Sequence, residues 1–131
     1  MIIDTSAVIA ILGDEPDRPD FERAIAHAAR PRMSAAAFVE AAIVVDSRGN
    51  PLLSRVFDDF IADAEIVVES VTASQAKIAR EAYRDFGRGS GHPARLNFGD
   101  CFSYALAKDA DDDLLFKGND FTHTDVRSAL T

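Results

Sequence analysis

Cysteine and basic residues are scarce in this sequence, and each shortage excludes a class of protein. The single cysteine, Cys101, cannot form an internal disulfide, which is typical of a chain from a reducing cytoplasm. The 14 lysines and arginines are outnumbered by 22 acidic residues, and the net charge of −8 argues against a nucleic-acid coat protein. No apolar run is long enough to span a bilayer, and the first predicted strand begins too early to follow a signal peptide. We therefore expect a cytoplasmic protein without a membrane anchor.

Strands and helices alternate along the chain, and the composition is that of a globular protein. With 131 residues, 47% of them hydrophobic, the sequence is long enough for one domain, 1–131, with a substantial core. Apolar and β-branched runs predict strands, and 3.6-residue periodicity predicts helices. The predicted strands are 1–3, 31–33 at an edge of the sheet, 65–69 and 114–116, and the predicted helices are 7–12, 21–29, 35–47, 52–64, 73–86 and 97–107. This alternation indicates the α/β class, with a parallel sheet covered by helices on both faces.

The first residues of the chain place a carboxylate at the end of a strand. Three apolar residues pass directly into Asp4, Thr5 and Ser6. In an open parallel sheet, ligands bind beyond the carboxyl ends of the strands, so Asp4 occupies a position where chemistry is common. A simpler function for Asp4 is to cap the helix that follows. The choice depends on whether other carboxylates fall at equivalent positions.

Three more carboxylates are candidates for the same site. Glu40 is a lone charge in an apolar, alanine-rich helix, and burying it without a partner would be costly. Asp100 lies in the first turn of a predicted helix, where it could instead complete a capping box with Asn97. Asp120 follows the last predicted strand, although a Gly-Asn-Asp turn would also account for it. Each of the three therefore has both a functional and a purely structural interpretation.

Together the four carboxylates suggest a metal site. The first and last strands can be neighbours in this architecture, so Asp4 and Asp120 would face one cleft, into which Glu40 and Asp100 can also point. Four carboxylates cannot all stay ionised together without a cation. Oxygen ligands without nearby histidine or cysteine favour Mg²⁺ or Mn²⁺, and carboxylate-bound ions of this kind support attack of water on a phosphodiester. The side chains expected to orient these ligands or to hold metal-bound water are Thr5, Ser6 and Asn119.

One part of the chain is basic. Residues 72–96 carry five basic and two acidic side chains, a local charge of +3 within a chain of −8. Most of the basic residues recur at three- and four-residue spacing, which places them on one stripe of a helix. A solvated helix face is the ordinary interpretation, and contact with RNA phosphates is the functional one. The candidate RNA contacts are Lys77, Arg80, Arg84, Arg88 and Arg95.

These motifs resemble the PIN-domain family, and within it the VapC toxins of bacterial toxin–antitoxin pairs. The resemblance covers essentially the whole chain. Its segments, in order, are 2–7, Glu40 in its apolar helix, 92–101, and 114–121 followed by Thr124 and Asp125. Their shared order and spacing are far more specific than Asp-Thr-Ser alone.

The resemblance implies a PIN-like three-layer α/β/α domain with a short central parallel sheet. It also implies a Mg²⁺-dependent ribonuclease, the toxin of a type II toxin–antitoxin system, which a cognate VapB-type antitoxin holds inactive in the bacterial cytoplasm. The assemblies it implies are a homodimer and a toxin–antitoxin hetero-oligomer. The metal ligands that carry over are Asp4, Glu40, Asp100 and Asp120, with Asp125 as an outer member.

Two other functions stay open at this point. A phosphoacceptor domain also needs clustered acids and a lysine near a late strand, for which Lys117 is a candidate, but residues 65–70 do not end in the expected Asp. An aspartyl-phosphate phosphatase would carry a second Asp where this chain has Ser6. A non-catalytic module whose acids bind a basic partner is the other alternative. The three histidines form no evident pair for metal-free RNA cleavage, so the sequence favours the metal-dependent nuclease.

Overall fold

The computed structural model describes residues 1–130, in which four short parallel strands form one sheet. The strand order is β3-β2-β1-β4, with Ile2 opposite both Arg32 and Leu114. The strands are β1 (Ile2–Ile3), β2 (Arg32–Ser34), β3 (Val67–Glu69) and β4 (Leu114–Leu115). Because β1 and β4 are adjacent and parallel, their carboxyl ends meet at the same edge of the sheet.

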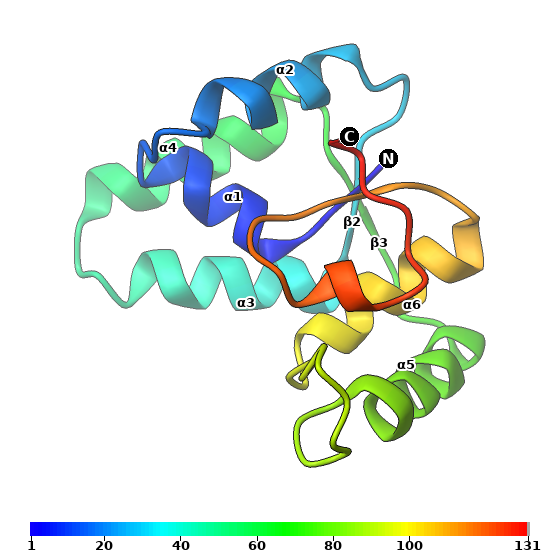
Figure 1. Ribbon diagram of the computed structural model, residues 1–131. Helices are drawn as coiled ribbons and strands as arrows, with labels where there is room; N and C mark the ends of the chain where they lie inside the picture. The colour runs from blue at the N-terminus through cyan, green and yellow to red at the C-terminus, as the bar shows by residue number, and fades with distance from the viewer. Residues whose placement is uncertain (131) are drawn as a thin grey trace.

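Helices α1 to α4 lie on one side of the strands, and α5 and α6 lie on the other (Figure 1). Their bounds are α1 (Thr5–Leu12), α2 (Arg18–His27), α3 (Ala35–Asp46), α4 (Pro51–Asp63), α5 (Ala73–Phe86) and α6 (Asp100–Ala110), followed by the 3₁₀ helix η1 (Phe121–His123). This arrangement is the expected three-layer α/β/α fold. None of the helices within residues 1–130 has the length and unbroken apolar character that crossing a membrane requires.

Side chains of the expected type begin four of the helices. Asp4, Ser34, Asn50 and Thr72 each accept a hydrogen bond from a backbone N–H in the first turn of the helix that follows. Such caps stabilise a helix by about 1 kcal/mol because they satisfy donors that have no partner within the helix. The helix starts predicted at residues 7, 35, 52 and 73 agree with the starts of α1, α3, α4 and α5 to within two positions.

The alternation of side chains along the strands divides the core into two layers. Ile3, Met33 and Leu115 are fully buried against α1 to α4. Ile2 and Leu114, one residue earlier in their strands, are fully buried against α5 and α6. Burial of each such side chain contributes about 1.5–3 kcal/mol, so strands of only two or three residues are held by packing on both faces.

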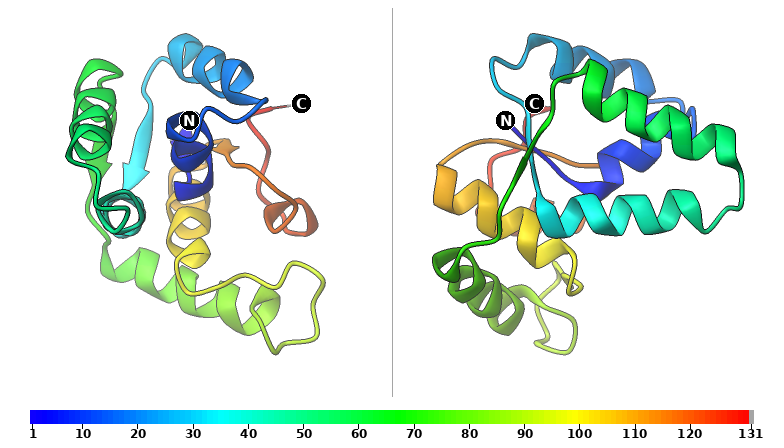
Figure 2. Two further views of the ribbon diagram at one scale, coloured as in Figure 1. Left: turned by 90° about the vertical axis from the view of Figure 1, so that its left-hand side faces the viewer. Right: turned by 180° about the vertical axis from the view of Figure 1, so that it is seen from behind.

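One local prediction is wrong, and another is confirmed. The segment 31–33 was expected at an edge of the sheet, but β2 lies inside it, between β1 and β3. Helix α5 ends at Phe86 as expected, so Arg88 does not continue its stripe, and residues 87–99 make a long excursion before α6 (Figure 2). The error at β2 arises because the neighbours of a strand depend on contacts with other parts of the chain.

Candidate active site

Asp4 stands at the carboxyl end of β1 and is also the N-cap of α1. Its carboxylate is almost completely buried, with 3% exposed. Oδ2 accepts hydrogen bonds from the backbone N–H of Ser6 at 3.0 Å and from its hydroxyl at 2.7 Å. No hydrogen bond to Oδ1 is present within residues 1–130, so this oxygen is available for a ligand. The capping and ligand interpretations of Asp4 are thus compatible, because the two oxygens have different partners.

Asp100 is the first residue of α6, and its conformation is set by Asn97. The Asn97 side chain accepts from the Asp100 N–H at 2.8 Å, and Asp100 Oδ2 accepts from the Asn97 N–H at 3.0 Å. This reciprocal pair is the capping box predicted for these residues. Oδ1 of Asp100 accepts no hydrogen bond within residues 1–130. Here too, one oxygen holds the helix start and the other remains available.

The pKa of Asp100 shows that the four carboxylates share one electrostatic environment. Burial, together with the negative charges of Asp4, Asp120 and Glu40, raises the pKa of Asp100 to about 7 against the opposing hydrogen bond from Asn97. The structure therefore places acids from β1, α3 and the segment after β4 within electrostatic range of the start of α6.

Glu40 approaches this cluster from α3 across Gly99. A Cβ on residue 99 would lie 2.8 Å from Cδ of Glu40, so the carboxylate rests against the glycine backbone directly before Asp100. Helix α3 is itself tied to α1, because the buried hydroxyl of Thr5 donates to the carbonyl of Ala37 at 3.0 Å. Thr5 was expected to orient ligands or water; its hydroxyl instead fastens the turn of α3 that precedes Glu40.

Asp120 is the exposed member of the cluster. It follows Gly118, whose φ of +96° suits a residue without a side chain, and it precedes η1. Asn119 is also exposed, and its carbonyl accepts from the Thr122 hydroxyl at 2.7 Å. Asp120 is the N-cap residue of η1, but its carboxylate accepts no capping hydrogen bond from that helix.

Asp125 has other partners. One of its carboxylate oxygens accepts from the Tyr104 hydroxyl at 2.7 Å, and the other pairs with Lys108 at 2.9 Å. Asp125 is not among the carboxylates that raise the pKa of Asp100. In this structure its contacts tie the C-terminal segment to α6.

The four carboxylates fit a hard divalent cation by their chemistry. All their donor atoms are oxygens, Asp4 and Asp100 each have an oxygen without a hydrogen bond, and their mutual repulsion would be relieved by positive charge. Within residues 1–130, no three acidic, histidine or cysteine side chains stand in a ready-made metal site. With a cation held by these oxygens, the arrangement could bind a phosphate group.

Comparison with known proteins agrees with this geometry. The family model described as "PIN domain" matches residues 1–127. The chain belongs to the PIN-domain family. Among curated relatives, ribonuclease VapC28 of Mycobacterium tuberculosis is 59% identical over 130 residues, covering 99% of this chain and 98% of the relative. Ribonuclease VapC42 of the same species is 50% identical over 131 residues and covers all of both chains. This PIN domain therefore groups with the VapC ribonucleases, as the motifs predicted.

Solved structures show the same fold at low sequence identity. M. tuberculosis VapC20, described as a toxin that cleaves the sarcin–ricin loop, superposes with a TM-score of 0.72 at 18% identity, covering 92% of each chain. A toxin–antitoxin complex from Klebsiella pneumoniae gives 0.71 at 14% identity, covering 98% of this chain and 96% of that one. At such identities, the likeness supports the PIN fold alone.

The basic residues of this PIN domain lie outside its carboxylate cluster. All five candidate RNA contacts are exposed, and Arg84 pairs with Asp85 at 3.0 Å. Within residues 1–130 the other four, Lys77, Arg80, Arg88 and Arg95, make no ion pair. The backbone N–H of Arg88 donates to the Leu96 carbonyl at 3.0 Å, which brings Arg88 near Arg95 across the base of the 87–99 excursion. The structure thus leaves a set of available positive charges on α5 and this excursion.

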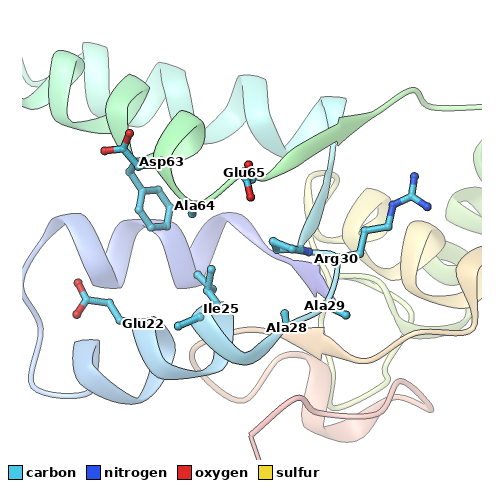
Figure 3. A pocket seen from close by; sticks show the side chains of 11 residues that line it. Glu22, Ile25, Ala28, Ala29, Arg30, Asp63, Ala64 and Glu65 are labelled. Atoms are coloured by element: carbon cyan, nitrogen blue, oxygen red, sulfur yellow. The ribbon is translucent and has the colours of Figure 1, made fainter.

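A separate hollow lies on the opposite side of the PIN domain, between α2 and α4. It measures about 480 Å³, and none of the four carboxylates lines it. Ile25, Ala28 and Phe60 supply apolar surface. The charged lining is Glu22, Asp63 and Glu65, which outnumber the one cation, Arg30 (Figure 3). A basic segment with apolar side chains would match this lining.

The contacts that Gly99 and Lys117 make in this PIN domain were not expected from the sequence. Gly99 admits Glu40, and only its place directly before Asp100 could have indicated this. The Lys117 ammonium pairs with Glu15 at 3.1 Å and Asp17 at 3.2 Å rather than standing free, as a phosphoacceptor site would need. The phosphoacceptor alternative is therefore not favoured.

Proposed function

We propose that residues 1–131 form one PIN domain that acts as a Mg²⁺-dependent ribonuclease, the toxin of a type II toxin–antitoxin system in the bacterial cytoplasm. The observation that carries the proposal is the shared environment of Asp4, Glu40, Asp100 and Asp120, which raises the pKa of Asp100 to about 7. The VapC relatives support the choice of RNA as substrate. Mn²⁺ is expected to replace Mg²⁺, because both prefer oxygen ligands.

The residues of the chain would bind the cation and orient the carboxylate oxygens that hold it. The four carboxylates would hold Mg²⁺, which supplies an acidified water and stabilises the charge of the phosphodiester during hydrolysis. Ser6 holds Oδ2 of Asp4, and Asn97 holds Oδ2 of Asp100, so that the second oxygen of each faces the ligand. Hydrolysis by this route leaves a 5′-phosphate and a 3′-hydroxyl.

The exposed cations of α5 and the following excursion would hold the RNA backbone. Lys77, Arg80, Arg88 and Arg95 make no internal ion pair within residues 1–130, so their charges are available to phosphates. Arg84 can join them by exchanging Asp85 for a phosphate, since a fully exposed pair of this kind is held only weakly. The excess of acidic side chains on the rest of the chain would limit RNA binding elsewhere on the protein surface.

A VapB-type antitoxin is the proposed inhibitor, and the hollow between α2 and α4 supports an interaction with it. An antitoxin segment with apolar and basic side chains would bury Ile25 and Phe60 and pair with Glu22 and Asp63 (Figure 3). The K. pneumoniae structure of similar fold is a toxin–antitoxin complex, which agrees with such a partner.

A homodimer is the proposed assembly of the free toxin, together with hetero-oligomers that contain the antitoxin. Val39 and Ile43, one turn apart on α3, are 52% and 62% exposed, and Phe98 beside them is 77% exposed. An apolar patch of this kind on a monomer usually marks an interface. A second copy of the chain is the proposed occupant.

Cleavage of RNA by the purified protein tests the proposed activity. We expect cleavage with Mg²⁺ or Mn²⁺, none after EDTA treatment, and recovery when excess Mg²⁺ is returned. The variant Asp4→Asn keeps a good helix cap but loses a carboxylate, so it should stay folded and become inactive. Asp59→Asn, an exposed acid on α4, is the matched control and should keep full activity.

Two results would contradict the proposal. If the EDTA-treated protein cleaves RNA as fast as the Mg²⁺-loaded protein, the metal-dependent mechanism is wrong. If no divalent ion supports cleavage while a basic partner binds, the protein is the non-catalytic binding module considered above.

A further inference from the structure

Lys117 occupies a junction between the carboxylate cluster and a distant turn. It directly follows Phe116 at the end of β4 and precedes Gly118, so it begins the segment that carries Asp120. Its ammonium bonds to Glu15 Oε2 at 3.1 Å and to Asp17 Oδ1 at 3.2 Å, both on the turn between α1 and α2. A cation shared by two carboxylates is held more firmly than one in a single surface pair.

The backbone of Lys117 is tied to the cluster as well. Its N–H donates to the Ser6 hydroxyl at 3.0 Å, and this hydroxyl donates to Asp4 Oδ2 at 2.7 Å. One residue therefore connects the turn between α1 and α2, the hydroxyl that orients Asp4, and the start of the segment bearing Asp120.

The rest of that segment is restrained locally, because the hydroxyl and the N–H of Thr122 both donate to the Asn119 carbonyl. Gly118 has a positive φ that glycine adopts without strain, Asn119 and Asp120 are exposed, and the next buried anchor is Phe121. Phe121 packs against Phe116, with ring centroids 5.2 Å apart. Between these aromatic anchors, Lys117 is the residue whose side chain bonds to another part of the fold, so its removal would loosen the segment that carries Asp120.

We propose that Lys117 is a positioning residue for the carboxylate cluster, which holds Asp120 toward Asp100 by clamping the start of its segment to Glu15 and Asp17. This inference depends on the proposed metal-dependent function. Without the clamp, ordering the segment would cost conformational entropy each time a cation binds. The consequence is weaker cation binding rather than a changed chemical step.

Three variants test the clamp. Lys117→Met keeps the length of the side chain and removes the charge, whereas Lys117→Arg keeps a cation that can reach two carboxylates. Arg127→Met is the matched control, because Arg127 also bridges two acids, Asp111 at 2.9 Å and Asp113 at 2.8 Å. These two acids precede β4, so this pair does not hold the segment that carries Asp120.

Mn²⁺ binding, measured by calorimetry on protein freed of metal, is the main readout. Loss of a residue that orients metal ligands typically costs about 10-fold in affinity, and we expect that loss for Lys117→Met. Lys117→Arg and Arg127→Met should stay within about 2-fold of the wild type. Amide hydrogen exchange of residues 117–124 in the metal-free protein should quicken in Lys117→Met alone, and excess Mg²⁺ should restore its RNA cleavage.

The outcomes separate this inference from the proposed function. If Lys117→Met binds Mn²⁺ as the wild type does, or only melts at a lower temperature with unchanged affinity, the clamp is overturned while the nuclease proposal stands. If the wild-type protein neither binds Mn²⁺ nor cleaves RNA, the proposed function fails, and the inference fails with it.

Discussion

Glu40 rests against the backbone of Gly99 so closely that any side chain at position 99 would displace its carboxylate. A Cβ there would stand 2.8 Å from Cδ of Glu40 and 2.9 Å from its Oε1. Because Gly99 directly precedes Asp100, this contact sets the approach of two carboxylates that come from distant parts of the chain. A substitution at Gly99 is therefore expected to disturb the candidate active site.

The variant Gly99→Ala should displace the Glu40 carboxylate without unfolding the protein. The backbone of Gly99 is in the helical region, which alanine favours, and the obstructed group is the flexible end of a side chain. We expect Mn²⁺ affinity and RNA cleavage to fall roughly 10-fold. In a double-mutant cycle with Glu40→Gln, the two losses should not add, because both remove the same carboxylate. Full activity of Gly99→Ala would contradict this interpretation.

The stability of the metal-free protein should depend on pH through Asp100. The folded-state pKa of Asp100 is raised to about 7, above the value of about 4 in an unfolded chain. Between these values the unfolded state releases a proton that the folded state keeps, so this group lowers the free energy of unfolding as the pH rises from about 4 to about 7.

Urea denaturation in EDTA measures this effect. After allowance for solvent screening, we expect Asp100→Asn to be about 1–2 kcal/mol more stable than the wild type near pH 8 and nearly equal to it near pH 4. The difference between the two proteins isolates Asp100 from the other acids. A difference that does not change with pH would show that Asp100 is not perturbed.

Neutralising cations of α5 and the following excursion should weaken RNA binding in a salt-dependent way. In an Asp100→Asn background, which prevents cleavage, Arg80→Gln with Arg88→Gln removes two candidate phosphate contacts. For single-stranded RNA the slope of log K against log salt should become shallower by about 1.4. The control pair Arg48→Gln and Arg55→Gln, also exposed and without an ion pair within residues 1–130, should leave the slope unchanged. Equal effects of the two pairs would remove the case for a dedicated RNA surface.

A charge on the exposed face of α3 should dissociate the proposed homodimer. Ile43 is 62% exposed in the single chain, and Ile43→Glu would place a carboxylate in the interface without disturbing the core. Light scattering after size exclusion should show a dimer for the wild type and a monomer for the variant. Val68→Glu, on the exposed face of β3, should stay dimeric. A wild type that is already monomeric at assay concentrations would exclude this assembly.

Charge reversal in the hollow between α2 and α4 should weaken antitoxin binding and spare the nuclease. With Glu22→Lys and Asp63→Lys, we expect roughly 10-fold weaker binding of the cognate antitoxin, mainly through slower association. RNA cleavage without antitoxin should be unchanged, because these residues are not among the carboxylates around Asp100. Asp58→Lys with Asp59→Lys, on the same helix outside the hollow, is the control. Unchanged inhibition of the Glu22 and Asp63 variant would place the antitoxin elsewhere.

Local chemistry determined much of what the sequence alone could predict. An apolar run ending in Asp4 specifies a strand followed by a capped helix, and the reciprocal bonds of Asn97 and Asp100 follow from their spacing. The cationic spacing of α5 is likewise a property of nearby residues. These features depend on a few neighbouring backbone groups, so sequence patterns are sufficient to indicate them.

Only the tertiary structure decides that the four carboxylates lie near one another. The sequence could name Asp4, Glu40, Asp100 and Asp120 as candidates, but only the pairing of β1 with β4 and the crossing of α3 over Gly99 brings them into one field. The same holds for Thr5, which bonds to α3, and for Lys117, which reaches a turn about a hundred residues away. The physical reason is that such contacts follow from how the two core layers pack around the sheet, which no local pattern of residues encodes.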